Sequence, residues 1–289
     1  MQDPARRFKR WAARRLAAAY VAGPKLEDAL RVRREAESRG WSTTIGFWNG
    51  PEHDPASVFS ACRAALDAIE SEEADCYLSI KPDAFGYDFG RLSALLQAAR
   101  PCGVRIHFDA QHPDSAGRSF ALLQRAAGEF SNLGFTLPSR WRRSLQDAER
   151  LIDLGIPIRV VRGQWPDPGA PDLDPRAGFL QLIEGLRGRA KLVGVATHDA
   201  ALARESLNRL LDAGTPCELE QLLGWPLRGR SLGGASPVGA RLYIAYGHAW
   251  LPYDFSRLRD RPAVLGWALK DLVHGVYKNP VARIERRDR

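Results

Sequence analysis

The sequence predicts an α/β fold, a single (β/α)8 barrel of the TIM type that follows an N-terminal helical extension. Three observations lead to this fold. The chain has 289 residues, 45% of them hydrophobic, which suffices for one large barrel with a full core. From about residue 41 onward, short β-branched or apolar runs alternate with longer segments of helical period. Eight such runs with crossovers fit into about 250 residues, the usual size of this barrel.

Eight segments have strand character, with β-branched and aromatic residues bounded by turn residues. They are 43–47, 76–82, 105–110, 132–138, 156–163, 191–197, 217–223 and 240–247. Between them, apolar residues recur at three- and four-residue spacing, which predicts helices over 57–70, 91–100, 115–129, 144–154, 176–188 and 199–213. The seventh crossover is weakly marked.

Residues 1–40 form the predicted helical extension, and residues 41–289 form the barrel with a C-terminal helix over its mouth. The extension reads as a basic helix, which carries Arg6 and Arg15, followed by an amphipathic helix over 25–39. A basic amphipathic helix can lie on an anionic membrane, which would give peripheral membrane contact. Packing against the barrel is the more frequent role of such a helix.

An open doubly wound sheet is the alternative fold. It is disfavoured because no G-x-G-x-x-G motif follows the first strand and no Walker motif occurs anywhere in the chain. No linker is long enough to divide the chain into two domains.

The charge balance does not point to a nucleic-acid partner. The chain has 42 basic and 34 acidic residues, hence a net charge of +8, but the basic residues are mostly arginines spread along its whole length. The four cysteines lack CxxC spacing, so we expect reduced thiols without a zinc or dithiol centre. No apolar run reaches the length of a membrane span and no signal-peptide pattern is present, so we expect a cytoplasmic protein.

Polar residues lie where several predicted strands end. Catalytic residues of such barrels lie at the carboxyl ends of the strands, so these side chains are candidates for the barrel mouth. In strand order, the candidates are Lys81, Asp109, Arg159, Arg162, Thr197, His198, Asp199, Glu218, Glu220 and Tyr243.

The residue types suggest a division of roles. Lys81 and Asp109, on adjacent strands, can form a pair that positions a substrate amine. The two arginines of strand five, together with the Thr-His turn after strand six, suit a phosphate-bearing ligand. Taken one at a time, each residue is also explained as a solvated or ion-paired group at the rim.

A further cluster follows the last strand. Tyr253, Arg257 and Asp260 are spaced i, i+4 and i+7 and therefore share one helical face. A ring, a guanidinium and a carboxylate on one face could clamp a small amino acid. An amphipathic last helix with an internal Arg–Asp pair explains the same spacing.

Two other enzyme classes are alternatives. His107 and Asp109 lie at i, i+2, and His198 and His248 end later strands, which would suit a metal-dependent barrel hydrolase. We predict no metal site, because such barrels usually open with an H-x-H pair and the first strand here has no histidine. A Schiff-base aldolase using Lys81 ranks lower, because an adjacent aspartate would keep this lysine charged.

Taken together, six fragments resemble the proline dehydrogenase family, flavin enzymes built on a distorted (β/α)8 barrel. The resemblance runs from about residue 20 to residue 275. The third fragment resembles the family's R-L-V-K-G-A-Y-W segment, and the sixth resembles its closing R-x-Y-x-P-Y-G-x-x-W-x-P-Y-x-x-R-R-L-x-E signature. In order, the fragments are YLSIKPDAFG, RIHFDAQ, RVVRGQW, VATHDAA, ELEQLLGW and RLYIAYGHAWLPYDFSRLRD.

The resemblance implies an FAD-dependent oxidation of L-proline, or a related cyclic amino acid, to an imine of the 1-pyrroline-5-carboxylate type. Electrons would pass to a quinone or another acceptor. The catalytic and substrate-binding roles would fall on Lys81, Asp109, Leu222, Tyr243, Tyr253, Arg257 and Asp260. The FAD contacts would fall on Arg159, Val161, Arg162, Gly163, Trp165, Thr197, His198 and Asp199.

Several positions depart from the family pattern. Ser256 precedes Arg257 where the family has paired arginines, so a single guanidinium would hold the substrate carboxylate. Gly50 stands where the strand-one loop tends to carry a glutamate. These changes motivate an alternative function, a catalytically altered barrel that works as a ligand-binding protein. The other departures are Pro138, Trp165, Asp199 and Glu220.

Overall fold

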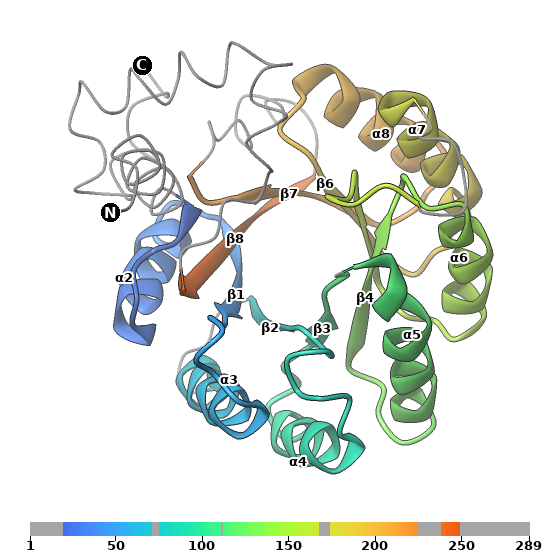
Figure 1. Cartoon of the computed structure of the whole chain (residues 1–289). Coiled ribbons are helices and arrows are strands. Elements are labelled where there is room, and N and C mark those ends of the chain that lie inside the picture. The colour runs from blue at the N-terminus through green and yellow to red at the C-terminus, as the bar shows by residue number, and fades with distance from the viewer. Residues whose placement is uncertain (1–19, 71–74, 111, 168–173, 225–237, 249–289) are drawn as a thin grey trace, which may run out of the picture.

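The chain forms a closed barrel of eight parallel strands surrounded by helices (Figure 1). The computed structural model describes residues 20–70, 75–110, 112–167, 174–224 and 238–248. The strands follow one another around the barrel in chain order, and the first closes against the last. The predicted (β/α)8 barrel is confirmed.

Each strand lies within two residues of a segment that the sequence marks. The longest stretch of pairing joins β1 to β8, from Ser42 opposite Arg241 to Trp48 opposite Gly247. The strands are β1 (Ser42–Trp48), β2 (Cys76–Ile80), β3 (Ile106–Phe108), β4 (Leu133–Pro138), β5 (Ile158–Val161), β6 (Val193–Ala196), β7 (Cys217–Leu222) and β8 (Gly239–Gly247).

Helices cover the outside of the barrel (Figure 1). Aspartates cap four of them, since the side chains of Asp54, Asp88, Asp174 and Asp199 accept hydrogen bonds from first-turn backbone N–H groups. The described helices are α2 (Leu26–Glu37), α3 (Pro55–Glu70), α4 (Phe89–Ala99), α5 (Pro113–Ala127), α6 (Arg143–Asp153), α7 (Pro175–Leu186) and α8 (Ala200–Asp212).

Helix α2 precedes the barrel at the predicted amphipathic segment and packs against β1 and β8. Just before it, Val21 forms a parallel bridge with Ala245 of β8. The predicted basic first helix, the weak seventh crossover at 225–237 and the predicted C-terminal helix lie outside the described residues. The division of the chain at residue 40 stays a prediction.

The hydrophobic core lies between the strands and the helices. Outward-facing strand residues such as Ile45, Leu78 and Val195 are fully buried against apolar helix residues such as Leu66 and Leu95. Each buried side chain of this size contributes about 1.5–3 kcal/mol. The four cysteines form no disulfide, and burial raises the pKa of Cys62 to about 12.

The inside of the barrel is polar and charged, which corrects one expectation from the sequence. Arg159, Glu218 and Glu220 were expected at the strand ends, because a charge within a core is costly. The structure instead buries them inside the barrel, where ion pairs with opposite charges offset that cost.

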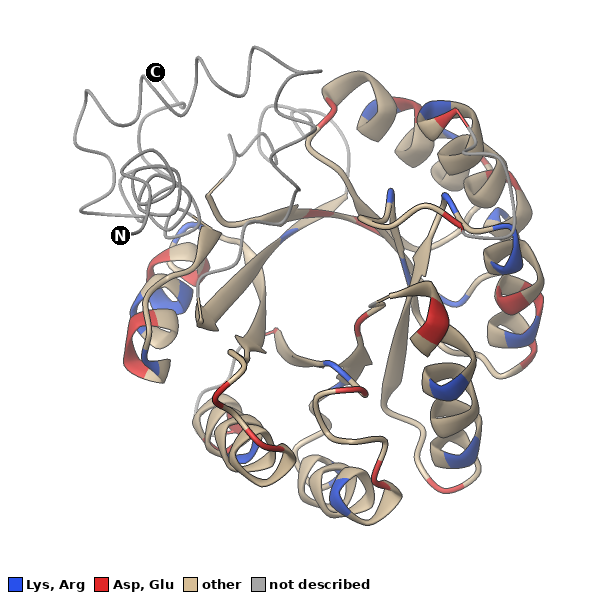
Figure 2. Ribbon diagram, in the orientation of Figure 1, with Lys and Arg blue, Asp and Glu red and all other residues tan. Residues whose placement is uncertain are grey.

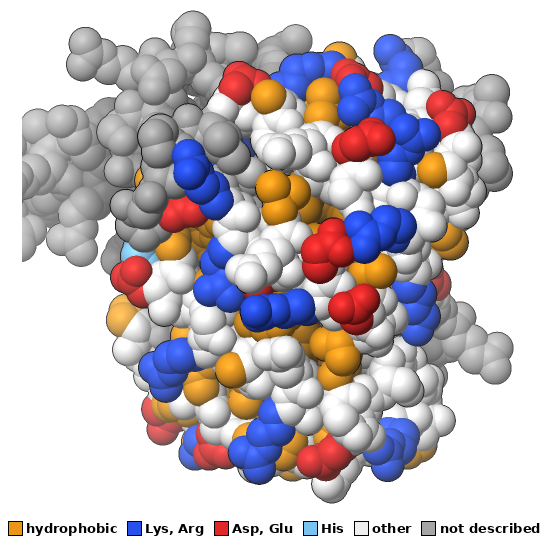
Figure 3. Space-filling view, turned by 90° about the vertical axis from the view of Figure 1, so that its right-hand side faces the viewer, with side chains coloured by type: hydrophobic (Ala, Val, Ile, Leu, Met, Phe, Trp, Pro, Cys, Tyr) orange, Lys and Arg blue, Asp and Glu red, His pale blue; other side chains and the backbone are white. Residues whose placement is uncertain are grey.

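On the outer surface, Lys, Arg, Asp and Glu follow the helices (Figure 2). Figure 3 shows basic and acidic side chains mixed on one face. Ion pairs between partly exposed side chains, such as Arg189–Glu149 and Arg209–Glu205, are found on the helices. This face therefore has no basic stripe of the kind that nucleic acid needs. Within the described residues, no helix combines the length and apolar character needed to cross a membrane.

Candidate active site

The site is built on Asp109, which immediately follows β3 at the mouth of the barrel. Its side chain is 14% exposed. Arg159 of β5 donates from Nη1 to Asp109 Oδ1 at 2.5 Å, and Tyr243 of β8 donates from its hydroxyl to Oδ2 at 2.7 Å. Thr136 of β4 donates to Oδ1 at 3.4 Å. Both oxygens of this carboxylate are therefore held by side chains from strands around the barrel.

Arg159 links this carboxylate to a second one, Glu220 of β7. Its Nε lies 2.8 Å from Glu220 Oε2 and its Nη2 lies 2.7 Å from Oε1. The hydroxyl of Tyr77 accepts from Nη2 at 2.9 Å and donates to Glu220 Oε2 at 3.1 Å. These carboxylates raise the pKa of Arg159 despite its burial, so the guanidinium stays charged.

A second ion-pair cluster lies one layer deeper. Arg241 of β8 donates from Nε to both oxygens of Glu218, at 2.9 and 3.0 Å, and from Nη2 to Asp75 at 2.7 Å. The ring of Tyr77 lies between the two layers, with the Arg241 and Arg159 guanidinium carbons 4.5 and 5.7 Å from its centroid. The deeper layer supports the floor of the site.

Lys81 follows β2 and lies beside Trp48, its Nζ 5.4 Å from the centroid of the indole ring. Burial lowers the pKa of Lys81, while the charges of Asp109 and Asp83 act in the opposite direction. The sequence suggested a Lys81–Asp109 ion pair. Within the described part of the chain Asp109 instead pairs with Arg159, because the Arg159 side chain reaches across the interior of the barrel.

Trp48, at the end of β1, is a site residue that the sequence reading missed. With Leu222 it packs against a small apolar cluster that contains Tyr243, Ala245 and Val21. These side chains form an apolar wall next to the Asp109 carboxylate. An aromatic residue at a strand's carboxyl end is a signal that could have pointed to Trp48, since the other candidates were chosen by that position.

The ends of β5 and β6 carry the residues assigned to FAD. Val161 ends β5, and Arg162, Gly163 and Trp165 follow it. Gly163 has φ +88°, and a Cβ there would lie 2.7 Å from the Cβ of Pro138, so the turn requires glycine. The ring of Trp165 is 41% exposed.

After β6, His198 Nε2 accepts a hydrogen bond from the backbone N–H of Leu222 at 3.0 Å, which joins this turn to the end of β7. Thr197 Oγ1 accepts from the backbone N–H of Asp199 at 3.1 Å. The Asp199 carboxylate accepts from Ala201 and Leu202, both at 3.0 Å. Asp199 therefore serves as the cap of α8, which is a structural role.

The two arginines predicted for strand five lie at different depths. Arg159 lies on the inner face of β5 and is 3% exposed, whereas Arg162 follows the end of the strand. Glu220, Tyr77 and Asp109 occupy the Arg159 guanidinium, so this side chain belongs to the floor of the site. Of the two arginines, Arg162 is the one positioned for an anion at the mouth.

His107 is buried inside the barrel, two residues before Asp109 in the chain and one layer deeper. Its Nε2 lies 2.9 Å from Thr136 Oγ1, and its ring stacks on Tyr77 with centroids 5.4 Å apart. Burial, and then the nearby arginines, lower its pKa well below the usual value of 6.5. Among the described residues, no group of three or more His, Cys, Asp or Glu side chains could hold a metal ion.

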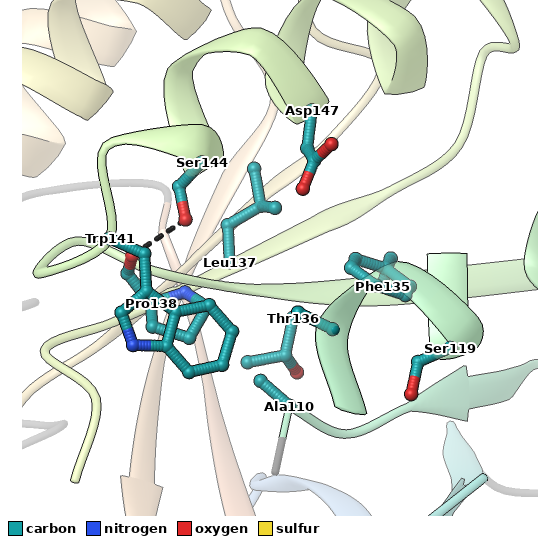
Figure 4. Close-up of a pocket in the computed structure, with 10 residues that line it drawn as sticks. Ala110, Ser119, Phe135, Thr136, Leu137, Pro138, Trp141, Ser144 and Asp147 are labelled. Carbon is teal, nitrogen blue, oxygen red and sulfur yellow. Dashed lines mark hydrogen bonds between the residues drawn. The ribbon is translucent and has the colours of Figure 1, made fainter. Parts of the chain in front are cut away.

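A small cavity adjoins the site on the helix side of β4 (Figure 4). The Ser144 hydroxyl donates to the Pro138 carbonyl at 2.7 Å, and Asp147 is paired with Arg143 at 2.7 Å. Because Ser144 and Asp147 are occupied by these contacts, the cavity belongs to the packing of α5 and α6 on the barrel. Its lining is Ala110, Ala116, Ser119, Phe135, Thr136, Leu137, Pro138, Trp141, Ser144 and Asp147.

Among curated proteins, the chain is 25% identical to Proline dehydrogenase 1 of Bacillus subtilis subsp. natto over 271 residues, covering 88% of this chain and 89% of that protein. It is also 25% identical to Proline dehydrogenase of Deinococcus radiodurans over 290 residues, covering 93% of both. Over most of its length the chain is thus similar to curated proline dehydrogenases. The resemblance inferred from the six fragments is confirmed, although no family model matches.

Solved structures share the fold of this chain. Proline utilization A from Bdellovibrio bacteriovorus, inactivated by N-propargylglycine, superposes with a TM-score of 0.71 at 14% identity, over 81% of this chain and 31% of that one. Proline utilization A from Corynebacterium freiburgense gives a TM-score of 0.62 at 17% identity, over 98% of this chain and 34% of that one. The chain thus spans about a third of these larger proteins.

The remaining predicted site residues, Tyr253, Arg257 and Asp260, lie outside the described residues, as does Ser256. Their roles stay predictions. The described site brings together Asp109, Tyr243 and Arg159, with Lys81 and Leu222 beside them.

Proposed function

We propose that this protein is an FAD-dependent dehydrogenase that oxidises L-proline, or a closely related cyclic amino acid, to the cyclic imine. The proposal rests on the Asp109 carboxylate, which lies at the mouth of the barrel next to an apolar wall. Tyr243 and Arg159 hold it in place by hydrogen bonds. An acidic group beside an apolar surface suits a ring that carries a cationic amine. Similarity to curated proline dehydrogenases over most of the chain supports the same reaction class.

The residues at the ends of β5 and β6 fit FAD. A dinucleotide presents an anionic pyrophosphate and two flat ring systems, and Arg162, Thr197 and His198 offer a cation and hydrogen-bonding groups to such a ligand. The exposed ring of Trp165 is suited to stacking. In this proposal, Gly163 and Val161 line the cofactor with their backbone. When bound, the flavin supplies the acceptor for the hydride.

The chain's own side chains would bind and orient the substrate. Asp109 accepts hydrogen bonds from the substrate amine, and Tyr243 and Leu222 contact the ring. Lys81, close to the Asp109 carboxylate, contributes positive charge beside the substrate. From the segment after β8, the Arg257 guanidinium would bind the substrate carboxylate through two parallel hydrogen bonds. Tyr253 would contact the substrate ring, and Asp260 would pair with Arg257.

We propose a quinone or another soluble or membrane acceptor for the electrons, and a cytoplasmic location. The basic segment at the start of the chain has the composition of a surface-binding helix, which would give peripheral contact with an anionic membrane. Sedimentation with vesicles that contain anionic lipid, compared with neutral vesicles, tests this contact.

An absorbance spectrum tests the central proposal. The purified protein, or the protein after addition of FAD, should absorb between about 350 and 500 nm, and L-proline should bleach these bands under anaerobic conditions. A protein that stays colourless after FAD is added would contradict the cofactor. Retained flavin that proline does not bleach would contradict the substrate.

A further inference from the structure

Glu220 is the buried group that the proposed reaction leaves without a role. It is 2% exposed and comes from β7, on the opposite side of Arg159 from Asp109. Glu220 is also one of the positions at which the chain departs from the family pattern. Opposite the end of Glu220 lies Gly194 of β6, whose Cβ would stand 3.3 Å from Glu220 Oε2. The strand beside Glu220 thus leaves room for its side chain.

A carboxylate binds Arg159 here in a way that an amide cannot. Glu220 Oε2 accepts from Arg159 Nε at 2.8 Å and from Tyr77 at 3.1 Å, while Oε1 lies 2.7 Å from Nη2 as an ion-pair contact. A glutamine has a single acceptor oxygen, and its NH2 group would face an N–H donor of the guanidinium. Glu220 therefore fixes the plane of the guanidinium, which aims Nη1 at Asp109.

The charges around Asp109 add to the argument. Two cations, Arg159 and Lys81, act on the Asp109 carboxylate. Without Glu220, Asp109 alone among the described carboxylates would pair with Arg159, which would leave it less able to attract an incoming ammonium ion. With Glu220, the Arg159 guanidinium lies between two carboxylates. The Asp109 carboxylate can then attract a second cation from the substrate, since Glu220 already neutralises the Arg159 guanidinium.

We propose that Glu220 is a positioning residue that, by neutralising and orienting Arg159, keeps Asp109 available to a cationic substrate amine. This inference rests on the proposed function. It predicts that Glu220 governs selectivity for the charge on the ring heteroatom and has little effect on recognition of the carboxylate.

The test compares two ligands of the same shape in the full-length protein loaded with FAD. L-proline carries a ring ammonium, whereas tetrahydrofuran-2-carboxylate carries an uncharged ring oxygen in its place. Calorimetric titrations are run anaerobically with the flavin reduced beforehand, so that proline binds without reacting. In Glu220→Gln the Kd of proline should rise by about tenfold or more, while the Kd of the oxygen analogue stays within about threefold or falls.

Glu218→Gln is the matched control. Glu218 lies on the same strand, faces the same interior and also binds a buried arginine through both oxygens, but one layer deeper. The Glu218→Gln variant should keep the wild-type ratio between the Kd of proline and the Kd of the oxygen analogue. An equal loss of both ligands in Glu220→Gln, an unchanged ratio, or the same shift in Glu218→Gln overturns the inference.

Glu220→Asp keeps the negative charge and is the second variant, which is used if Glu220→Gln does not fold. A Kd ratio within about threefold of the wild type supports the role of charge, and a tenfold change overturns it. Failure of the wild type to bind either ligand would overturn the proposed function itself. Wild-type binding with an unaltered ratio in Glu220→Gln overturns only the role of Glu220.

Discussion

The hydroxyl of Tyr243 lies against the backbone of Gly46, so close that a Cβ at residue 46 would stand 2.3 Å from the hydroxyl oxygen. Both residues face the inside of the barrel, on the paired strands β1 and β8. The missing side chain lets the phenol ring extend across the interior and donate to Asp109 at 2.7 Å. A glycine on one strand thus determines where a site residue of the next strand can lie.

Substitution of Gly46 by alanine should displace Tyr243, because the new methyl group overlaps its hydroxyl. We expect the affinity for proline to fall by about tenfold, the equivalent of one lost hydrogen bond to a charged group. The free energy of unfolding should fall by about 1–3 kcal/mol. Calorimetric titration and urea unfolding measure the two effects. Gly185→Ala is the control, because a Cβ on this helical residue would have no atom within 4 Å. Equal effects of the two substitutions would show that Tyr243 is not the cause.

Tyr243→Phe separates the hydroxyl from the ring. Burial raises the pKa of Tyr243 well above its usual value of 10, so the hydroxyl is a neutral donor at physiological pH. Its loss should weaken proline binding by about tenfold and change the free energy of unfolding by about 1 kcal/mol. Tyr246→Phe is matched, since that hydroxyl donates at 3.1 Å to Ala61 on the helix side of β8. A similar loss of proline affinity in Tyr246→Phe would contradict a specific role for the Tyr243 hydroxyl.

Arg159→Met should strongly destabilise the barrel, because it leaves the buried carboxylates of Glu220 and Asp109 without their shared cation. Breaking such a pair costs about 3–5 kcal/mol, measurable by urea unfolding. The double variant Arg159→Met/Glu220→Gln should recover part of that loss, since one of the unpaired charges is then removed. Strictly additive losses would argue against the coupling of these two side chains.

Asp109 could be placed at the barrel mouth from the sequence because it immediately follows a recognisable strand, and Tyr243 could be placed on the last strand. Helices with clear caps, such as α8 after Asp199, were also predictable from local signals. These features depend on a few neighbouring residues. Strand order around the barrel follows from the βα rhythm.

The depth of each side chain inside the barrel could not be read in the same way. Alternation along a strand shows that Arg159 and Val161 share a face, but the layer that each occupies depends on the stagger between all eight strands. Arg159 meets a carboxylate 61 residues away at Glu220, and Tyr243 meets one 134 residues away at Asp109. Such pairings depend on how the barrel closes. The residues that neighbour either partner in the sequence do not indicate them.

Lowering the pH should reduce the stability of the protein through the buried His107. In the folded protein its pKa is well below 6.5, because burial and three nearby arginines disfavour the charged ring, whereas the unfolded chain takes up a proton near pH 6.5. Below that pH the unfolded state therefore binds one proton more than the folded state. Stability should fall by up to about 1.4 kcal/mol per pH unit from this residue alone, until the folded pKa is reached.

His107→Gln should remove this component of the acid sensitivity. The variant is expected to be less stable than the wild type at pH 7.5, but the gap should narrow by about 1 kcal/mol or more by pH 5.5. Urea unfolding at several pH values measures the gap, and the exposed His112→Gln controls for loss of a histidine as such. The carboxylates titrate in all three proteins, so the difference between the two variants isolates His107. Parallel pH profiles for the wild type and His107→Gln would mean that the ring takes up its proton without unfolding, which would require water to reach the layer beneath Asp109.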